Sequence, residues 1–311
     1  MKYILLLLSL VLVGCQTPRD YTISQYPIAG KAGNTPKFLI IHYTALNDTD
    51  SINVLSSGQV SIHYLIPSIP EVEITGRLTA IQMVDEKSIA WHAGQSYWQQ
   101  MQGLNKYSVG IEIVNRGFQT RLLGRHWFAY QPAQIELLAK LAKDIIQRYD
   151  IAPENVLGHS DISPGRKVDP GRLFPWQQLA EQGIGAWPEQ QTVKYYLAGR
   201  PVNKLVDPHD KLLPALERYG YQLPVSSTSM NSLSIKLLIQ AFQMHFRPAD
   251  ISGIADAETE AIALALVEKY RASKQQIITI NKSSINYKYQ FRYPIRGNRI
   301  YSLRSKTSEK Y

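Results

Sequence analysis

Two histidines and an aspartate lie where their side chains could bind a metal ion. His42 ends the apolar run 38–44, His159 follows the short apolar run 156–158, and Asp169 lies in a loop rich in proline and glycine. Two imidazoles and a carboxylate, with a fourth position left for water, form the usual open site of a catalytic zinc ion. No HExxH-type motif places these ligands on one helix, so the spacing alone is weak evidence.

Glu112 is a second residue that could do chemistry. It stands between Ile111 and Ile113 in an apolar run, so in a strand its side chain points to the face opposite both neighbours. In a cleft, this carboxylate could act as a general base. The other interpretation is a charge facing solvent on a half-exposed strand, and the residues alone favour that second interpretation.

The elements that must position these residues follow from the hydrophobic pattern. Apolar, β-branched runs predict strands over 38–44, 61–66, 78–84 and 108–114, and a short strand or turn at 156–159. Apolar residues at three- and four-residue spacing after Pro132 predict a helix that ends near Tyr149, and a short helix is expected over 175–182. Strands mixed with helices in this order predict an α/β domain over 36–190, with a mixed, mainly parallel sheet flanked by helices.

Three further amphipathic segments follow, around 212–219, 235–246 and 259–270. They predict a small three-helix bundle over 205–271. The remaining segment, 272–311, carries nine Lys or Arg and one acid, Glu309, and shows little helical period. We expect it to be a solvated, disordered basic tail.

The N-terminus predicts export and lipid anchoring. Lys2 precedes an apolar stretch that is too short to cross a bilayer of about 30 Å and has the layout of a secretory signal peptide. The run LVGC at 12–15 resembles the lipobox of bacterial lipoproteins, in which the cysteine is acylated. We therefore expect a signal peptide over 1–14, lipid on Cys15 and an irregular tether over 15–35. The alternative is an ordinary signal peptide with an incidental cysteine.

Charge and cysteine content narrow the function classes. The tail holds +8 of the net charge of +9, so the rest of the chain is close to neutral and a nucleic-acid-binding domain is not expected. Cys15 is the only cysteine, which excludes an intramolecular disulfide. Gln16, rather than aspartate, follows it, and by resemblance to Gram-negative sorting signals this favours the outer membrane, facing the periplasm.

Five motifs occur in the same order as in a known enzyme family. They are FLIIHYT (38–44), SIHYL (61–65), AWHAG (90–94), SVGIEIVN (108–115) and GHSDISPGRKVDPG (158–171). The chain thereby resembles the zinc-dependent N-acetylmuramoyl-L-alanine amidases, which include phage amidase lysins and animal peptidoglycan-recognition proteins. The likeness covers about 36–190 and is strongest to the lipoprotein branch of the family, which shares the stretch FPWQQ (174–178).

The resemblance implies roles for particular residues. His42, His159 and Asp169 become ligands of one Zn²⁺ per chain, and Glu112 becomes the catalytic acid and base. Lys167 becomes a second catalytic group that stabilises negative charge on the substrate oxygen. The implied reaction is hydrolysis of the amide between N-acetylmuramic acid and L-alanine in peptidoglycan, with the anhydro form of the sugar left open as a second substrate.

Other residues near these motifs receive lesser roles. Asp161 is a conceivable ligand, but a turn-capping role is preferred. His63 and the turn 91–94 are expected to line the cleft, with core packing and a satisfied hydrogen bond as the plain alternative. His126, His209 and His245 look ordinary.

The segment AFQ (241–243) with GIADAET (253–259) is similar to a peptidoglycan-binding domain. Peptidoglycan and muropeptides are then the expected partners, with the membrane reached through lipid on Cys15. Because every expected catalytic residue precedes residue 170, removing 205–311 should leave hydrolysis of small muropeptides nearly unchanged, unless the bundle walls the cleft. The alternatives are a non-catalytic peptidoglycan-recognition protein and a structural outer-membrane lipoprotein.

Overall fold

The computed structural model describes residues 19–70, 77–122, 124–224 and 232–272. The expected signal peptide, Cys15 and the basic tail beyond residue 272 lie outside these described residues. Those up to Arg271 form one compact unit. Within the described ranges, no helix combines the length and the apolar character needed to cross a bilayer.

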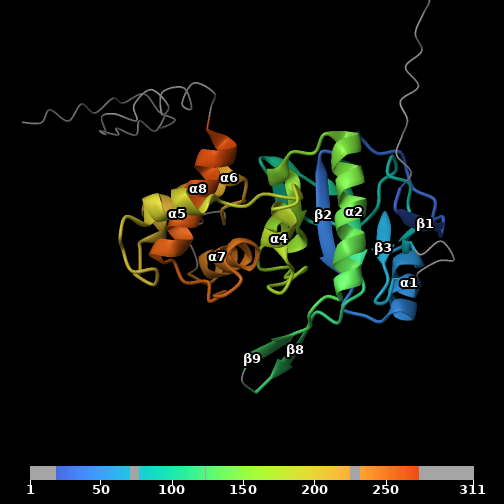
Figure 1. Ribbon diagram of the computed structural model, residues 1–311, viewed down its shortest axis with the longest axis horizontal. Helices are drawn as coiled ribbons and strands as arrows, with labels where there is room; N and C mark the ends of the chain where they lie inside the picture. Colours follow the sequence, from blue (N-terminus) through green and yellow to red (C-terminus); the bar gives the residue numbers. More distant parts are fainter. Residues whose placement is uncertain (1–18, 71–76, 123, 225–231, 273–311) are drawn as a thin grey trace, which may run out of the picture. The chain divides into compact units, whose positions relative to one another are not determined.

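A six-stranded sheet forms the centre of the fold (Figure 1). Its spatial order is β1-β4-β3-β7-β2-β10, and all neighbours are parallel except the antiparallel pair β3 and β4. The strands are β1 (Tyr21–Gln25), β2 (Phe38–Tyr43), β3 (Tyr64–Ile66), β4 (Leu78–Gln82), β7 (Ser108–Ile113) and β10 (Val156–Gly158). The predicted mixed, mainly parallel sheet is confirmed.

Strand β2, which lies between β7 and β10, is buried on both faces, as its unbroken apolar run predicts. Alternate side chains point to opposite faces, and they enter two separate cores. Leu39 and Ile41 join the core under α2 (Pro132–Tyr149), whereas Phe38 and Ile40 join a core shared with the C-terminal helices. The two faces of one strand therefore connect both halves of the molecule.

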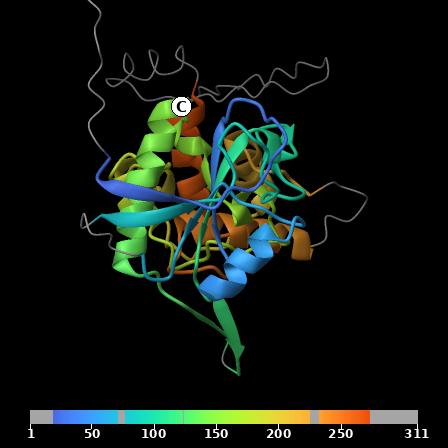
Figure 2. The same cartoon turned by 90° about the vertical axis from the view of Figure 1, so that its right-hand side faces the viewer.

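The remaining elements surround this sheet. They are α1 (Asp48–Ser56), β5 (Tyr97–Trp98), β6 (Met101–Gln102), η1 (Leu104–Lys106), β8 (Phe118–Arg121), β9 (Gly124–Trp127), η2 (Pro153–Asn155), α3 (His159–Ile162), α4 (Trp176–Ala180), α5 (Gln190–Leu197), η3 (Pro208–Leu212), α6 (Leu213–Tyr219), α7 (Ser232–Phe246) and α8 (Ala257–Arg271). The hairpin of β8 and β9, which the sequence analysis did not predict, projects away from the sheet (Figure 2).

We call residues 19–187 the sheet region and residues 190–271 the helical region. The three helices expected in the helical region are present as α6, α7 and α8, and α5 packs against α8 as a further helix. Phe242, Leu238 and Tyr221 of the helical region share one core with Phe38 and Leu157 of the sheet. The two regions are thus joined by buried apolar surface.

The expected tether over 15–35 is wrong for part of its length. Residues Tyr21–Gln25 form β1, which pairs with β4 from Tyr21 opposite Leu78 to Gln25 opposite Gln82. Tyr21 is only 3% exposed, and its hydroxyl donates a hydrogen bond to Asp144 on α2 at 2.7 Å. Partners that are distant in sequence stabilise this strand. Its local hydrophobic pattern is too short to predict it.

Glu86 ties three parts of the sheet region together. Its carboxylate accepts hydrogen bonds from Tyr64 on β3 at 2.7 Å, from Arg148 at 2.6 Å and from Tyr149 at 2.7 Å. Arg148 and Tyr149 belong to the last turn of α2. Burial by itself would raise the pKa of the Glu86 carboxyl, but these hydrogen bonds outweigh it and lower the pKa below the ordinary value of 4.5.

Glu86→Gln should therefore make the protein less stable in a pH-dependent way. Because the folded-state pKa lies below the unfolded one, the stabilisation by Glu86 is complete above about pH 4.5 and is lost as the pH falls through the lowered value. We expect the variant to lose about 2 kcal/mol of unfolding free energy at neutral pH. As the pH falls further, its unfolding free energy should decrease less steeply than that of the wild type. Denaturant unfolding at several pH values measures both effects.

The control is Glu136→Gln, which changes an exposed residue on α2, the helix that carries Arg148 and Tyr149. It should alter stability by less than about 0.5 kcal/mol. Equal effects of the two substitutions would contradict the anchoring role of Glu86.

Candidate active site

The parallel strands bring the expected site residues to one edge of the sheet. β10, β2 and β7 are neighbours, and the carboxyl ends of parallel strands meet at the same edge. His42 stands near the end of β2, directly opposite Glu112 in the register of β7. His159 follows Gly158, the last residue of β10, and is the first residue of α3.

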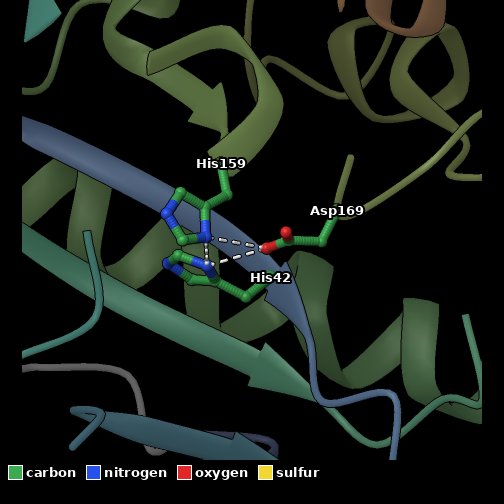
Figure 3. Close-up of side chains that lie close together, drawn as sticks. All are labelled: His42, His159 and Asp169. Carbon is green, nitrogen blue, oxygen red and sulfur yellow. Dashed lines mark hydrogen bonds and ion pairs between the residues drawn. The ribbon is translucent and has the colours of Figure 1, made fainter. Parts of the chain in front are cut away.

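The side chains of His42, His159 and Asp169 converge on one another (Figure 3). The Nδ1 atoms of the two histidines lie 2.9 Å apart. Asp169 Oδ2 lies 3.0 Å from His42 Nδ1 and 3.1 Å from His159 Nδ1. All three residues are buried. The structure thus brings together the three residues that the sequence analysis selected, across 127 residues of chain.

The donor set fits a bound metal cation. Burial, with a further contribution from the neighbouring His159, lowers the pKa of His42 to about 4, so this imidazole is neutral at neutral pH and offers a lone pair. Burial would raise the pKa of Asp169, but the adjacent His159 and His42 outweigh it and hold the pKa below its usual range. Three donors at this mutual spacing can each lie about 2.0–2.2 Å from one common point, which are ordinary zinc–ligand distances.

A chain of hydrogen bonds supports His42 from behind. Its Nε2 lies 2.9 Å from His92 Nδ1, and His92 Nε2 lies 3.2 Å from the hydroxyl of Ser108, which donates to the carbonyl of Leu104. Such partners of a metal ligand set its ring orientation and tautomer. His92 was expected to line the cleft; instead it is a buried partner of His42.

Gly110 makes room for this arrangement. A Cβ atom at this position would lie 2.7 Å from His92 Nδ1, closer than side chains normally pack. A glycine inside a strand often marks such a close approach. Gly110 lies in the motif SVGIEIVN, and it is the sequence signal that could have indicated a residue packed against β7.

His159 has a separate support. Its Nε2 lies 3.2 Å from the carbonyl oxygen of Ala93. Arg166 donates hydrogen bonds to that same oxygen at 3.0 Å and to the carbonyl oxygen of Gln95 at 2.8 Å. Arg166, which was not among the residues expected from the sequence, joins the loop around Ala93 to the loop that carries Asp169.

Glu112 lies beside this cluster with an unusual carboxyl group. Its Oε2 atom is buried and has no hydrogen-bond partner in the described part of the chain. Burial raises the pKa of Glu112 well above 4.5, the charge of Asp169 adds to this rise, and the ammonium group of Lys167 opposes it. A carboxyl with one buried oxygen and a raised pKa, beside a cluster that could hold a metal ion, suits proton transfer at neutral pH.

Lys167 is half-buried and close enough to influence both Glu112 and His42 electrostatically. Its backbone N–H donates to the carbonyl of Ser163 at 3.1 Å, which holds the loop between His159 and Asp169 in a turn. The structure therefore places all five residues selected for chemistry near one another.

The secondary expectations have mixed outcomes. His63 is fully buried: its Nε2 bonds the carbonyl of Ser88 and its Nδ1 accepts from the N–H of Gly110, so the plain alternative of a satisfied core residue is correct. Trp91 is 48% exposed and is therefore not packed in the core. The expectation that His245 is ordinary is wrong, since its Nδ1 lies 2.7 Å from Asp161 Oδ2 inside the protein.

Comparison with known proteins agrees with this site. Residues 32–172 match the N-acetylmuramoyl-L-alanine amidase family. The chain is 51% identical to N-acetylmuramoyl-L-alanine amidase AmiD of Escherichia coli strain K12 over 234 residues, which cover 75% of this chain and 83% of that protein.

Solved structures give the same result. A complex of E. coli AmiD with the substrate anhydro-N-acetylmuramic acid-L-Ala-D-γ-Glu-L-Lys has a TM-score of 0.73 and 50% identity, covering 78% of this chain and 93% of that one. A Pseudomonas aeruginosa AmpDh3 structure in complex with anhydromuramic pentapeptide has a TM-score of 0.68 and 40% identity, covering 85% and 99%. The sheet topology, the convergent site and these likenesses together place the chain in the N-acetylmuramoyl-L-alanine amidase family.

Proposed function

We propose that this protein hydrolyses the amide bond between N-acetylmuramic acid, including its anhydro form, and L-alanine in peptidoglycan fragments. The observation that carries the proposal is the position of Glu112, whose buried carboxyl lies on the strand next to His42 of the three-donor cluster. The substrate class is supported by AmiD and AmpDh3, whose structures contain anhydromuramyl peptides.

We further propose that the metal is zinc and that His42, His159 and Asp169 hold it. Two imidazoles and a carboxylate are typical ligands of a catalytic zinc site. When bound, zinc supplies Lewis acidity, which polarises an amide carbonyl and lowers the pKa of water.

The protein's own residues supply the remaining chemistry. Glu112 accepts a proton from the attacking water and returns it to the amine that leaves. Lys167 stabilises the negative charge that develops on the carbonyl oxygen. The support chain through His92 keeps the imidazole of His42 oriented while the reaction proceeds.

A recognition protein without activity, or a purely structural lipoprotein, is less well supported. Neither function requires a buried, unpaired carboxyl oxygen beside a metal-binding cluster, and an unpaired buried oxygen lowers stability. We also propose that acylated Cys15 anchors the protein to the outer membrane on its periplasmic side; the lipobox-like run at 12–15 supports this.

The purified protein should contain about one zinc ion per chain and should release intact stem peptides, beginning with L-alanine, from anhydromuramyl peptides. Chelation should abolish the reaction and added zinc should restore it, because the proposed reaction depends on the Lewis acidity that zinc supplies. Elemental analysis and mass spectrometry of the products measure these outcomes. Cleavage at another bond, or full activity after verified removal of the metal, would overturn the proposal.

Glu112→Gln should retain zinc but lower kcat by about 10²–10⁴-fold, because the amide cannot accept the proton. Metal content and steady-state rates are measured on the same preparation, with Glu136→Gln as the exposed control. A kcat close to that of the wild type would remove Glu112 from the mechanism. Loss of zinc would identify it as a ligand instead.

Cys15→Ala should abolish lipid attachment and shift the protein from the membrane fraction to the soluble periplasmic fraction, because acyl chains provide the anchor. Labelled palmitate and cell fractionation measure this. Equal palmitate incorporation in variant and wild type would exclude lipidation at Cys15.

A further inference from the structure

Asp161 is a buried carboxylate two residues after the metal-binding His159. It is 1% exposed. Its Oδ2 atom accepts from the backbone N–H of Gly158 at 2.7 Å and faces Nδ1 of His245 at 2.7 Å, while Oδ1 accepts from the hydroxyl of Tyr221 at 2.6 Å. A buried carboxylate is tolerated only when such partners compensate for its lost hydration. Asp161 is therefore neither a ligand nor a simple turn cap.

Two of these three partners come from the helical region. Tyr221 follows α6 and His245 lies on α7, and both are buried. Packing holds each of them: Tyr221 contacts Trp98 edge-on with ring centroids 4.9 Å apart, and His245 stacks on Trp176 at 3.8 Å. The Nε2 atom of His245 has no partner in the described residues. Since a Phe could stack equally well without an unpaired nitrogen, the contact with Asp161 is what distinguishes histidine here.

Asp161 in turn controls the backbone on which His159 is mounted. Its bond to Gly158 caps the first turn of α3, a helix of four residues that is too short to be stable alone. Two residues after Gly158, the N–H of Ser160 donates to the backbone carbonyl of Asp169 at 2.9 Å. Asp161 thereby helps to fix the backbone positions of His159 and Asp169, two of the three residues proposed to bind the metal.

We propose that Tyr221 and His245 are positioning residues for the metal site and that they act through Asp161. The inference rests on the proposed function, because it takes zinc as the ion that His42, His159 and Asp169 hold. The helical region then serves the catalytic centre as well as any wall polymer it binds. Removal of 205–311 should weaken metal binding, contrary to the expectation from the sequence that the two regions work separately.

Tyr221→Phe in the full chain tests this, since it removes one hydroxyl and keeps the ring. Zinc affinity is measured by competition with a chromophoric chelator, and the melting temperature is measured on the metal-free protein. Loss of a supporting partner typically weakens metal binding by about 10–100-fold, and we expect a value near the lower end. His245→Phe, which keeps the stacked ring, should have the same effect. This second variant replaces Tyr221→Phe in the test if Tyr221→Phe does not fold.

Tyr64→Phe is the matched control. Tyr64 is also buried, and its hydroxyl donates to a carboxylate, that of Glu86, at 2.7 Å, but neither residue touches the site. It should lower the melting temperature of the metal-free protein as Tyr221→Phe does, yet leave the zinc affinity unchanged. If Tyr221→Phe and His245→Phe bind zinc as tightly as the wild type, the positioning role is wrong and the contact is merely structural.

A double-mutant cycle tests the route. If Tyr221 acts through Asp161, the effects of Tyr221→Phe and Asp161→Asn on zinc affinity will not add, whereas independent effects would add. Additive effects would overturn the route through Asp161. Failure of the wild-type protein itself to bind zinc would instead overturn the proposed function, so the two failures are distinguishable.

Discussion

The close approach of three donor atoms, from His42, His159 and Asp169 and within 3.1 Å of one another, is the constraint on which this structure depends. Two imidazole lone pairs and a carboxylate oxygen repel one another at this spacing unless positive charge lies among them. Side chains on flexible segments would separate. The fold prevents this by placing His42 in a doubly buried strand and His159 at the end of its neighbour, β10.

The supporting contacts extend this rigidity outward. On one side His92 and Ser108 hold the ring of His42, and on the other Arg166 joins the loops that flank His159. Three buried side-chain atoms of the described residues have no hydrogen-bond partner: Thr79 Oγ1, His245 Nε2 and Glu112 Oε2. Of these, only the Glu112 atom belongs to a carboxyl beside the cluster of His42, His159 and Asp169, where it suits proton transfer.

The helical region belongs to this arrangement. It shares a core with the strands, and Tyr221 and His245 reach the metal-binding loop through Asp161. The AmiD complex matches 78% of this chain, a share larger than the sheet region alone. The pairing of the two regions is thus common to this chain and that relative, and the contact at Asp161 gives it a physical reason.

Local sequence determined many of the elements: the strands β2, β4 and β7 and the helix α2 follow from hydrophobic periodicity within short stretches of chain. The roles of His42, His159, Asp169 and Glu112 followed only from the resemblance of five ordered motifs to a known family, because the spacing of these residues alone is weak evidence. Tertiary structure alone decided that Tyr21–Gln25 forms a strand, that His92 supports His42, and that His245 bonds Asp161 across 84 residues. Those outcomes depend on partners that are distant in sequence, and no period or local motif within one chain records such a partner.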